Sequence, residues 1–226
     1  MDDTVKVWVD CTPSEEALDY LKNMPDSIRL LGISYSNGDG ALNKQFEQFS
    51  VPVVEGFLFP MREIASSAAE TLSPVIPMND VLKNVESFWI VAMGPLTNIA
   101  ALLRCQPKLK EKVKGILLLG GGAYKGDVLP SVEKNFCTDP EAASIVFQSG
   151  YPLYLIPYEM RENPLSVLSN LDSYTWENAF VEVDLWGAKT RGASVIDFNS
   201  KITGRKPNSF VLTHGNGDSV LRHGHI

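Results

Sequence analysis

The sequence predicts an α/β fold of the Rossmann-like type, an open, mostly parallel central sheet flanked by helices. Short and nearly continuous apolar runs recur along the chain. Such runs are typical of strands buried on both faces of a parallel sheet. The segments between them carry apolar residues at helical spacing. An alternation of strands and helices favours a parallel sheet with right-handed crossovers.

The expected strands follow the apolar runs, and they are Val5–Val9, Arg29–Ser34, Val51–Val54, Phe88–Ala92, Gly115–Leu119 and Leu153–Ile156. A helix is expected from about Ser14 to Lys22. A second helix begins after Asp139, a natural N-cap followed by Pro140, and ends at Gly150. These elements cover the first two thirds of the chain.

The pattern weakens after Pro157, so we expect a fold that is incomplete toward the C-terminus. Residues 158–178 are polar and irregular, and Phe180–Trp186 returns to strand-like alternation. No Pro/Gly/Ser-rich linker divides the chain. We therefore expect one domain over residues 1–212 and a disordered tail over residues 213–226.

Composition excludes some classes of function. The chain has 226 residues, 44% of them hydrophobic, and a formal net charge of −7. The sequence lacks the stripe of Lys and Arg residues that nucleic-acid binding needs, and no apolar run is long enough to span a membrane. Three cysteines without metal-binding spacing favour a reducing compartment. The first residues lack the features of a signal peptide. We expect a soluble, cytoplasmic protein.

Polar segments follow the expected strands and form the candidate site. They are Asp10–Glu16, Asn37–Gly40, Met93–Asn98 and Gly120–Asn135. Ligands of open α/β sheets bind at the carboxyl ends of the strands. The three glycines from Gly120 lack the spacing of a dinucleotide or phosphate-binding loop, so a tight turn is the better interpretation. The residues alone predict a small polar ligand or a metal.

Two stretches carry a resemblance to a known family. The run IVAMGPLTNIAALL is followed by ILLLGGGAYKGDVLPSVEKNFCTDPEAASIVFQSG, together covering Ile90 to Gly150. They resemble the inosine/uridine-preferring nucleoside hydrolases in order and spacing. VDCTPSEEAL, LLGISYSNGDGAL, VPVVEG and VEVDLWGAKTRGASVIDF are weaker family-like stretches. The sequence is therefore identified as a shortened, divergent member with the nucleoside hydrolase fold.

The resemblance implies an activity, a cofactor and an assembly. The family hydrolyses the N-glycosidic bond of purine and pyrimidine ribonucleosides to ribose and free base. It uses a calcium ion that grips the ribose hydroxyls, and an aspartate that deprotonates a water. Calcium takes about six to eight oxygen ligands. The resemblance also implies a homo-oligomer, and a ribonucleoside or ribose as the ligand.

The N-terminal acidic motif of the family is altered here. Asp10 matches its first aspartate, but Thr12 stands where the general base is expected. A hydroxyl cannot serve as a base near neutral pH. Glu16, with Glu15, replaces the aspartate pair that binds calcium, and the carbonyl of Met93 matches the backbone ligand. The alternative is that the two glutamates are only an acidic first helical turn.

The sugar-binding half is better preserved. Glu133 and Asn135 match the pair that the family uses on ribose hydroxyls, although Lys134 replaces the aromatic residue between them. Asp39 and Asp127 stand in place of asparagines, and a carboxylate offers no donor. Leu119 replaces a methionine that lines the pocket.

Two family segments are missing. Phe57–Ala69, the stretch directly after VPVVEG, contains no histidine. The late segment with the leaving-group histidine and the last calcium aspartate is absent between Tyr158 and Phe180. The histidines lie only at positions 214, 223 and 225. Three hypotheses remain: an active hydrolase with a rearranged site, a non-catalytic nucleoside-binding, ribose-binding or interaction subunit, and a truncated isoform. Catalysis is expected to be impaired and calcium binding to be weak or absent.

Overall fold

The computed structural model describes residues 4–36, 44–64, 74–130, 132–160 and 162–214. Its strands, in chain order, are β1 (Val5–Cys11), β2 (Ile28–Tyr35), β3 (Val53–Glu55), β4 (Phe88–Met93), β5 (Val113–Leu119), β6 (Leu153–Ile156), β7 (Thr175–Val183), β8 (Ser194–Asp197) and β9 (Ser209–His214). Its α-helices are α1 (Glu15–Lys22), α3 (Met61–Ile64), α4 (Val75–Leu82), α5 (Thr97–Cys105), α6 (Lys134–Thr138), α7 (Pro140–Phe147), α8 (Pro164–Ser169) and α9 (Ser200–Thr203).

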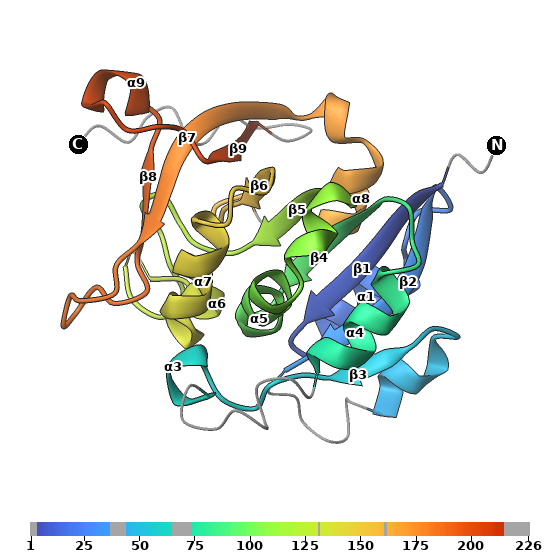
Figure 1. Ribbon diagram of the computed structural model, residues 1–226. Coiled ribbons are helices and arrows are strands. Elements are labelled where there is room, and N and C mark those ends of the chain that lie inside the picture. The colour runs from blue at the N-terminus through green and yellow to red at the C-terminus, as the bar shows by residue number, and fades with distance from the viewer. Residues whose placement is uncertain (1–3, 37–43, 65–73, 131, 161, 215–226) are drawn as a thin grey trace.

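One open sheet organises the molecule, with the strand order β3-β2-β1-β4-β5-β6-β9-β7-β8 (Figure 1). The strands from β3 to β9 in this order pair in parallel, whereas β7 is antiparallel to β9 and β8 is antiparallel to β7. The expected α/β fold with a mostly parallel sheet is confirmed. Each of the six expected strands is present, with ends shifted by a few residues at most.

The C-terminal part differs from the expectation. Residues 158–178, expected to be irregular, hold α8, a short 3-10 helix at Leu171–Ser173 and the start of β7. The strand-like run from Phe180 is the second half of β7, which ends at Val183. β9 inserts between β6 and β7 and reaches His214, two residues past the expected end of the domain. The remaining residues of the expected tail lie outside the described residues.

The helix starts follow the capping signals in the sequence. Ser14 caps α1 by accepting a hydrogen bond from the backbone N–H of Ala17, at 3.1 Å. Asp139 caps α7 in the same way through the N–H of Ala142, at 3.0 Å. These side chains satisfy N–H groups that have no partner inside the helix. The end of α7 lies at Phe147, three residues before the glycine at which we expected it.

Helices cover both faces of the sheet. α4, α5 and α7 pack over one face, on which Trp8, Ile90 and Ile116 are fully buried. α1 and α8 pack over the other face, against Val9 and Leu117. The alternation of neighbouring strand residues between two apolar layers explains why the strands are apolar almost throughout. Among the described helices, none is long and apolar enough to cross a membrane.

Candidate ligand-binding site

A cavity of about 170 Å³ lies at the carboxyl ends of β1, β4 and β5. Parallel strands bring their carboxyl ends to one edge, so loops distant in sequence meet there. The residues that line the cavity are Thr12, Ser14, Glu16, Met93, Leu119, Gly120, Asp127, Glu133, Lys134, Asn135 and Tyr158. Seven of the nine site residues expected from the sequence are in this list. We call this cavity the edge pocket.

Two expected site residues do not line the edge pocket. Asp39 lies outside the described residues. Asp10 is fully buried, and its Oδ1 accepts hydrogen bonds from Ser34 Oγ at 2.6 Å and from Asn98 Nδ2 at 2.8 Å. Burial raises the pKa of the Asp10 carboxyl to about 7, although the two hydrogen bonds act to lower it. Asp10 is placed as a buried link between β1, β2 and α5.

Thr12 reaches the pocket wall because β1 and the turn after β4 approach closely. A Cβ atom at Gly94 would lie 2.7 Å from the backbone nitrogen of Thr12 and 2.9 Å from the carbonyl carbon of Cys11. Real Cβ atoms do not come this close to backbone, so only glycine fits at position 94. This contact fixes the position of Thr12 next to Met93.

The carboxylate of Glu133 holds the loop that forms the pocket floor. Its oxygens accept hydrogen bonds from three backbone N–H groups, those of Gly121 at 2.9 Å, Asn135 at 2.9 Å and Phe136 at 3.3 Å. The residue is only 6% exposed, and burial raises the pKa of its carboxyl although the three N–H groups act to lower it. Glu133 is therefore the N-cap of α6 as well as part of the pocket.

The neighbouring polar side chains are also engaged with backbone. Asn135 donates from Nδ2 to the carbonyl of Leu119 at 2.8 Å, which ties α6 to the end of β5. Asp127 accepts from the backbone N–H of Lys134 at 2.8 Å. Lys134 itself is exposed at the pocket. The polar side chains of Asn135 and Asp127 are thus fixed by hydrogen bonds to backbone groups of the pocket.

Ser194 of β8 supports the glycine turn, and sequence reasoning missed it. Its hydroxyl accepts from the N–H of Gly122 at 2.7 Å and donates to the carbonyl of Gly122 at 2.8 Å. Gly121 has a φ of +64°, and a Cβ there would lie 2.6 Å from the ring of Phe136. The only signal in the sequence was that Ser194 lies in a family-like stretch. Tyr158 was missed for lack of any signal.

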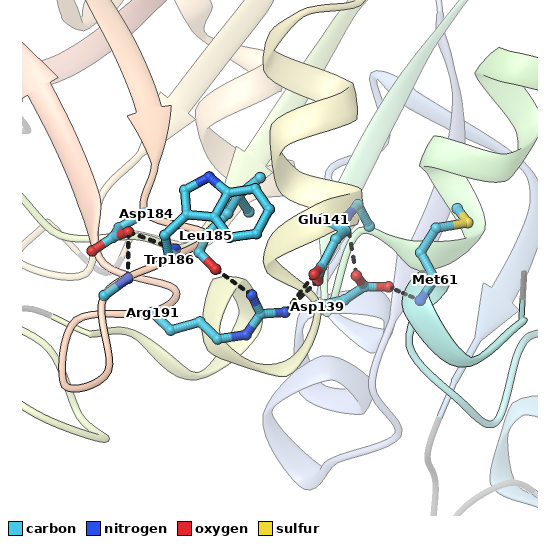
Figure 2. Close-up of polar contacts among 9 residues, drawn as sticks. Met61, Asp139, Glu141, Asp184, Leu185, Trp186 and Arg191 are labelled. Carbon is cyan, nitrogen blue, oxygen red and sulfur yellow. Dashed lines mark hydrogen bonds and ion pairs between the residues drawn. The ribbon is translucent and has the colours of Figure 1, made fainter.

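The hairpin that carries β8 is clamped to α7, as Figure 2 shows. Arg191 binds both carboxylate oxygens of Glu141 and donates to the carbonyl of Leu185. Burial acts to raise the pKa of Glu141, but the hydrogen bond and charge of Arg191 lower it overall. Asp184 closes the turn by accepting from the N–H groups of Trp186 and Gly187. The clamp keeps β8 against the pocket loop.

Asp139 connects the start of α7 to two other elements near the same edge. Its Oδ2 accepts from Thr97 Oγ1 at 2.6 Å and from the N–H of Met61 at 2.7 Å (Figure 2 draws the Met61 bond). The side chain is fully buried. The N-terminal turns of α3, α5 and α7 are therefore fixed by one carboxylate.

The sequence model of the family described as inosine-uridine preferring nucleoside hydrolase matches residues 7–175. The chain belongs to this family. The match covers β1 to the start of β7, and so includes all residues of the edge pocket.

Curated relatives and solved structures agree with the family. The pyrimidine-specific ribonucleoside hydrolase RihA of Enterobacter sp. (strain 638) is 29% identical over 197 residues, covering 66% of this chain and 61% of the relative. RihB of Escherichia coli (strain K12 / DH10B) is 30% identical over 188 residues, covering 69% of this chain and 60% of the relative. The chain thus spans about three fifths of the length of these relatives.

The fold is shared with several solved nucleoside hydrolases. The plant nucleoside hydrolase PpNRh1 has a TM-score of 0.73 and 19% identity, with 93% of this chain and 94% of that chain covered. The inosine-guanosine nucleoside hydrolase has a TM-score of 0.74 and 20% identity, with 92% and 93% covered. The purine-preferring ribonucleoside hydrolase from Gardnerella vaginalis has a TM-score of 0.71 and 21% identity, with 92% and 93% covered.

The described residues of the edge pocket do not by themselves supply a calcium site. In the described part of the chain, no group of three or more His, Cys, Asp or Glu side chains could hold a metal. Glu16 accepts from the hydroxyl of Tyr20 at 2.7 Å. Asp10 does not line the pocket, and its buried Oδ2 has no hydrogen-bond partner among the described residues. The carbonyl of Met93 and the carboxylates of Glu16, Asp127 and Glu133, each already in a hydrogen bond, form no such group, whereas calcium needs roughly six oxygens.

Proposed function

We propose that the edge pocket binds ribose or the ribose part of a ribonucleoside and does not hydrolyse the N-glycosidic bond at a rate typical of the family. Thr12 carries this proposal, because it lines the pocket where the family resemblance places the general base. The hydroxyl of threonine does not ionise near neutral pH, so it cannot take a proton from water there.

The carboxylates at the pocket do not replace this base. The carboxylate of Glu133 accepts hydrogen bonds from three backbone N–H groups, which orient it toward the backbone around Gly121 and Asn135. Asp127 accepts from the N–H of Lys134, and Glu16 accepts from Tyr20. None of the described residues that line the pocket is a histidine, the residue type that the family resemblance assigns to the leaving base.

Binding is supported by the size and lining of the pocket. A volume of about 170 Å³ is small beside the roughly 300–1,000 Å³ of typical ligand sites. It therefore suits a pentose better than a whole nucleoside. Hydroxyl, carboxylate, amide and ammonium groups line it, and these can donate to and accept from sugar hydroxyls.

Calorimetric titration with ribose, inosine and uridine tests the binding half of this proposal. We expect saturable binding of ribose that weakens about tenfold in Asp127→Ala, because a charged acceptor is lost with no amide in its place, a change of about 1.4 kcal/mol. Asp26→Ala, at an exposed turn before β2, is the matched control and should bind like the parent. A flat isotherm for ribose with the folded parent would contradict binding at this pocket.

Release of free base from inosine and uridine tests the catalytic half. We expect no release at family rates, with or without added calcium, and no rescue by Thr12→Asp. The general base is typically worth about 10²–10⁴-fold, and the pocket would still lack the histidine that the family resemblance assigns to the leaving base. Turnover by the parent at a rate typical of nucleoside hydrolases would overturn the non-catalytic proposal while leaving the binding result intact.

Family membership favours a second candidate, an active ribonucleoside hydrolase with a rearranged site. A tight calcium isotherm together with base release would support it. We further propose a cytoplasmic homo-oligomer. The three free cysteines, Cys11, Cys105 and Cys137, are consistent with a reducing compartment. Light scattering after size-exclusion chromatography measures the assembly, and a monomer would contradict the oligomer.

A further inference from the structure

A second hollow lies away from the edge pocket, on the side of the sheet that α1 and α8 cover. It has a volume of about 370 Å³ and is formed by β6, β7, β9 and the 3-10 helix η4 (Leu171–Ser173). Its lining residues are Tyr154, Leu171, Asp172, Tyr174, Trp176, Asn178 and Phe210. Four of these seven residues are aromatic. We call it the aromatic hollow.

The rings of the aromatic hollow are held in a fixed arrangement. Tyr154 has three aromatic neighbours: it stacks on Phe210 with centroids 4.9 Å apart, lies perpendicular to Trp176 at 5.2 Å and 88°, and meets Trp89 edge-on at 5.3 Å. Trp176 donates from Nε1 to the carbonyl of Leu171 at 3.0 Å, which sets the direction of the indole. The rings of Tyr154, Trp176 and Phe210 are only half-buried, so part of their surface remains open.

The local charge of the aromatic hollow is negative. Asp172 is exposed among the lining residues, and no Lys or Arg is one of them. In the described part of the chain Asp172 has no ion pair. Burial and the charge of Asp172 raise the pKa of Tyr154, and burial and the charge of Glu162 do the same for Tyr174. Both phenols are therefore neutral, and two carboxylates lie nearby.

This combination is selective for one kind of ligand. The faces of aromatic rings carry partial negative charge and attract cations, and tryptophan is the best of them. A carboxylate without a counter-ion adds attraction for a positive charge and disfavours an anion. A neutral apolar ligand would gain from the rings but not from Asp172. The connection between β6 and β7, as far as it is described, carries only α8 and η4 and leaves the rings accessible.

We propose that the aromatic hollow binds an organic cation of the alkylammonium class, with its methylated head group against Tyr154 and Trp176 and with Asp172 as the counter-ion. This site is separate from the edge pocket, since the two share no lining residue. It does not depend on the proposed function, and either can fail without the other.

The full chain is tested with choline and with 3,3-dimethylbutan-1-ol, its neutral isostere, by ligand-observed NMR. We expect the N-methyl protons of choline to shift upfield on saturable binding, because they lie over ring faces, and the neutral isostere to bind several-fold more weakly. Trp176→Leu and Asp172→Asn should each weaken choline binding about two- to fivefold. The control variant Asp26→Asn should bind choline like the parent.

Asp172 is exposed, so its replacement by asparagine leaves the packing of the sheet unchanged, and circular dichroism checks the fold of each variant. Equal affinity for choline and its isostere would show a merely apolar surface and overturn the proposal. Unchanged choline binding in a folded Asp172→Asn variant, or no saturable choline binding by the parent, would overturn it as well.

Discussion

Asn98 donates a hydrogen bond from Nδ2 to Oδ1 of Asp10 at 2.8 Å, joining the start of α5 to the end of β1 across 88 residues of chain. The same carboxylate oxygen accepts from Ser34, and the amide oxygen of Asn98 accepts from the N–H of Phe57 at 2.9 Å. One side chain therefore links β1 with α5 and the segment after β3. This buried link joins β1 and α5 next to Thr12 and Met93, two residues that line the edge pocket.

Replacing Asn98 tests the link. Asn98→Leu removes a donor to Asp10 and leaves the N–H of Phe57 buried without its acceptor, so we expect a loss of about 1–3 kcal/mol in the free energy of unfolding. Urea denaturation measures it. Asn84→Ala, at an exposed position, is the control and should change the stability by less than about 0.5 kcal/mol. Equal stability of Asn98→Leu and the parent would contradict the link.

Ser194→Ala tests the support of the glycine turn. The variant removes both hydrogen bonds between the hydroxyl and the backbone of Gly122, two buried groups. We expect the free energy of unfolding to fall by about 1–3 kcal/mol and ribose binding to weaken, because Gly120 beside the turn lines the pocket. The exposed Ser50→Ala is the matched control. A ribose affinity of Ser194→Ala equal to that of the parent would show that the glycine turn does not affect ribose binding.

Arg191→Met tests the clamp on the β7–β8 hairpin. Trp186 near the tip of this hairpin is 91% exposed, yet the turn is held by Arg191 and Asp184. Without the contacts to Glu141 and Leu185 we expect chymotrypsin to cleave after Trp186 several-fold faster than in the parent. Arg205→Met removes another hairpin ion pair, the one with Glu182, and serves as the control. The same cleavage rate in all three proteins would show that the clamp does not hold the tip.

The stability of the protein should depend on pH through Asp139. Burial raises the pKa of its carboxyl above the ordinary value, although hydrogen bonds from Thr97, Ala142 and Met61 act to lower it. The folded protein keeps this proton at pH values where the unfolded chain has lost it. The contribution of Asp139 is therefore complete below about pH 4 and decreases as the pH rises through the folded-state pKa.

Asp139→Asn cannot titrate, so its free energy of unfolding should lie furthest below that of the parent near about pH 4 and approach it as the pH rises. The variant should be less stable than the parent at low pH because its amide presents a donor to the N–H of Met61. Thermal unfolding of both proteins between about pH 4 and pH 8 measures this difference. A gap that widens with pH would show that the pKa of Asp139 is lowered in the folded protein.

Much of the fold could be predicted because local patterns encode it. The apolar runs of β1, β4 and β5 and the capping residues Ser14 and Asp139 act within a few positions of the chain. Once the sheet is known to be parallel, its strand ends must meet at one edge. The gathering of Thr12, Met93, Leu119 and Glu133 at the edge pocket follows from this geometry.

Other features depend on partners that no local pattern specifies. β9 inserts between β6 and β7, although it comes last in the chain, and Ser194 bonds to a glycine 72 residues away. The aromatic hollow likewise forms from three strands and a 3-10 helix. These arrangements depend on which surfaces bury the most apolar area when they pack together. That depends on the complete tertiary structure and not on any local segment.

The sequence by itself determined the family, the parallel sheet and the set of residues at its edge, because these rest on periodicity and on ordered motifs. Only the tertiary structure decided that Asp10 is turned into a buried hydrogen-bonded link with Ser34 and Asn98 and does not line the pocket. A motif fixes which residue follows a strand. The direction of its side chain is decided by where a buried carboxyl finds hydrogen-bond partners from neighbouring elements.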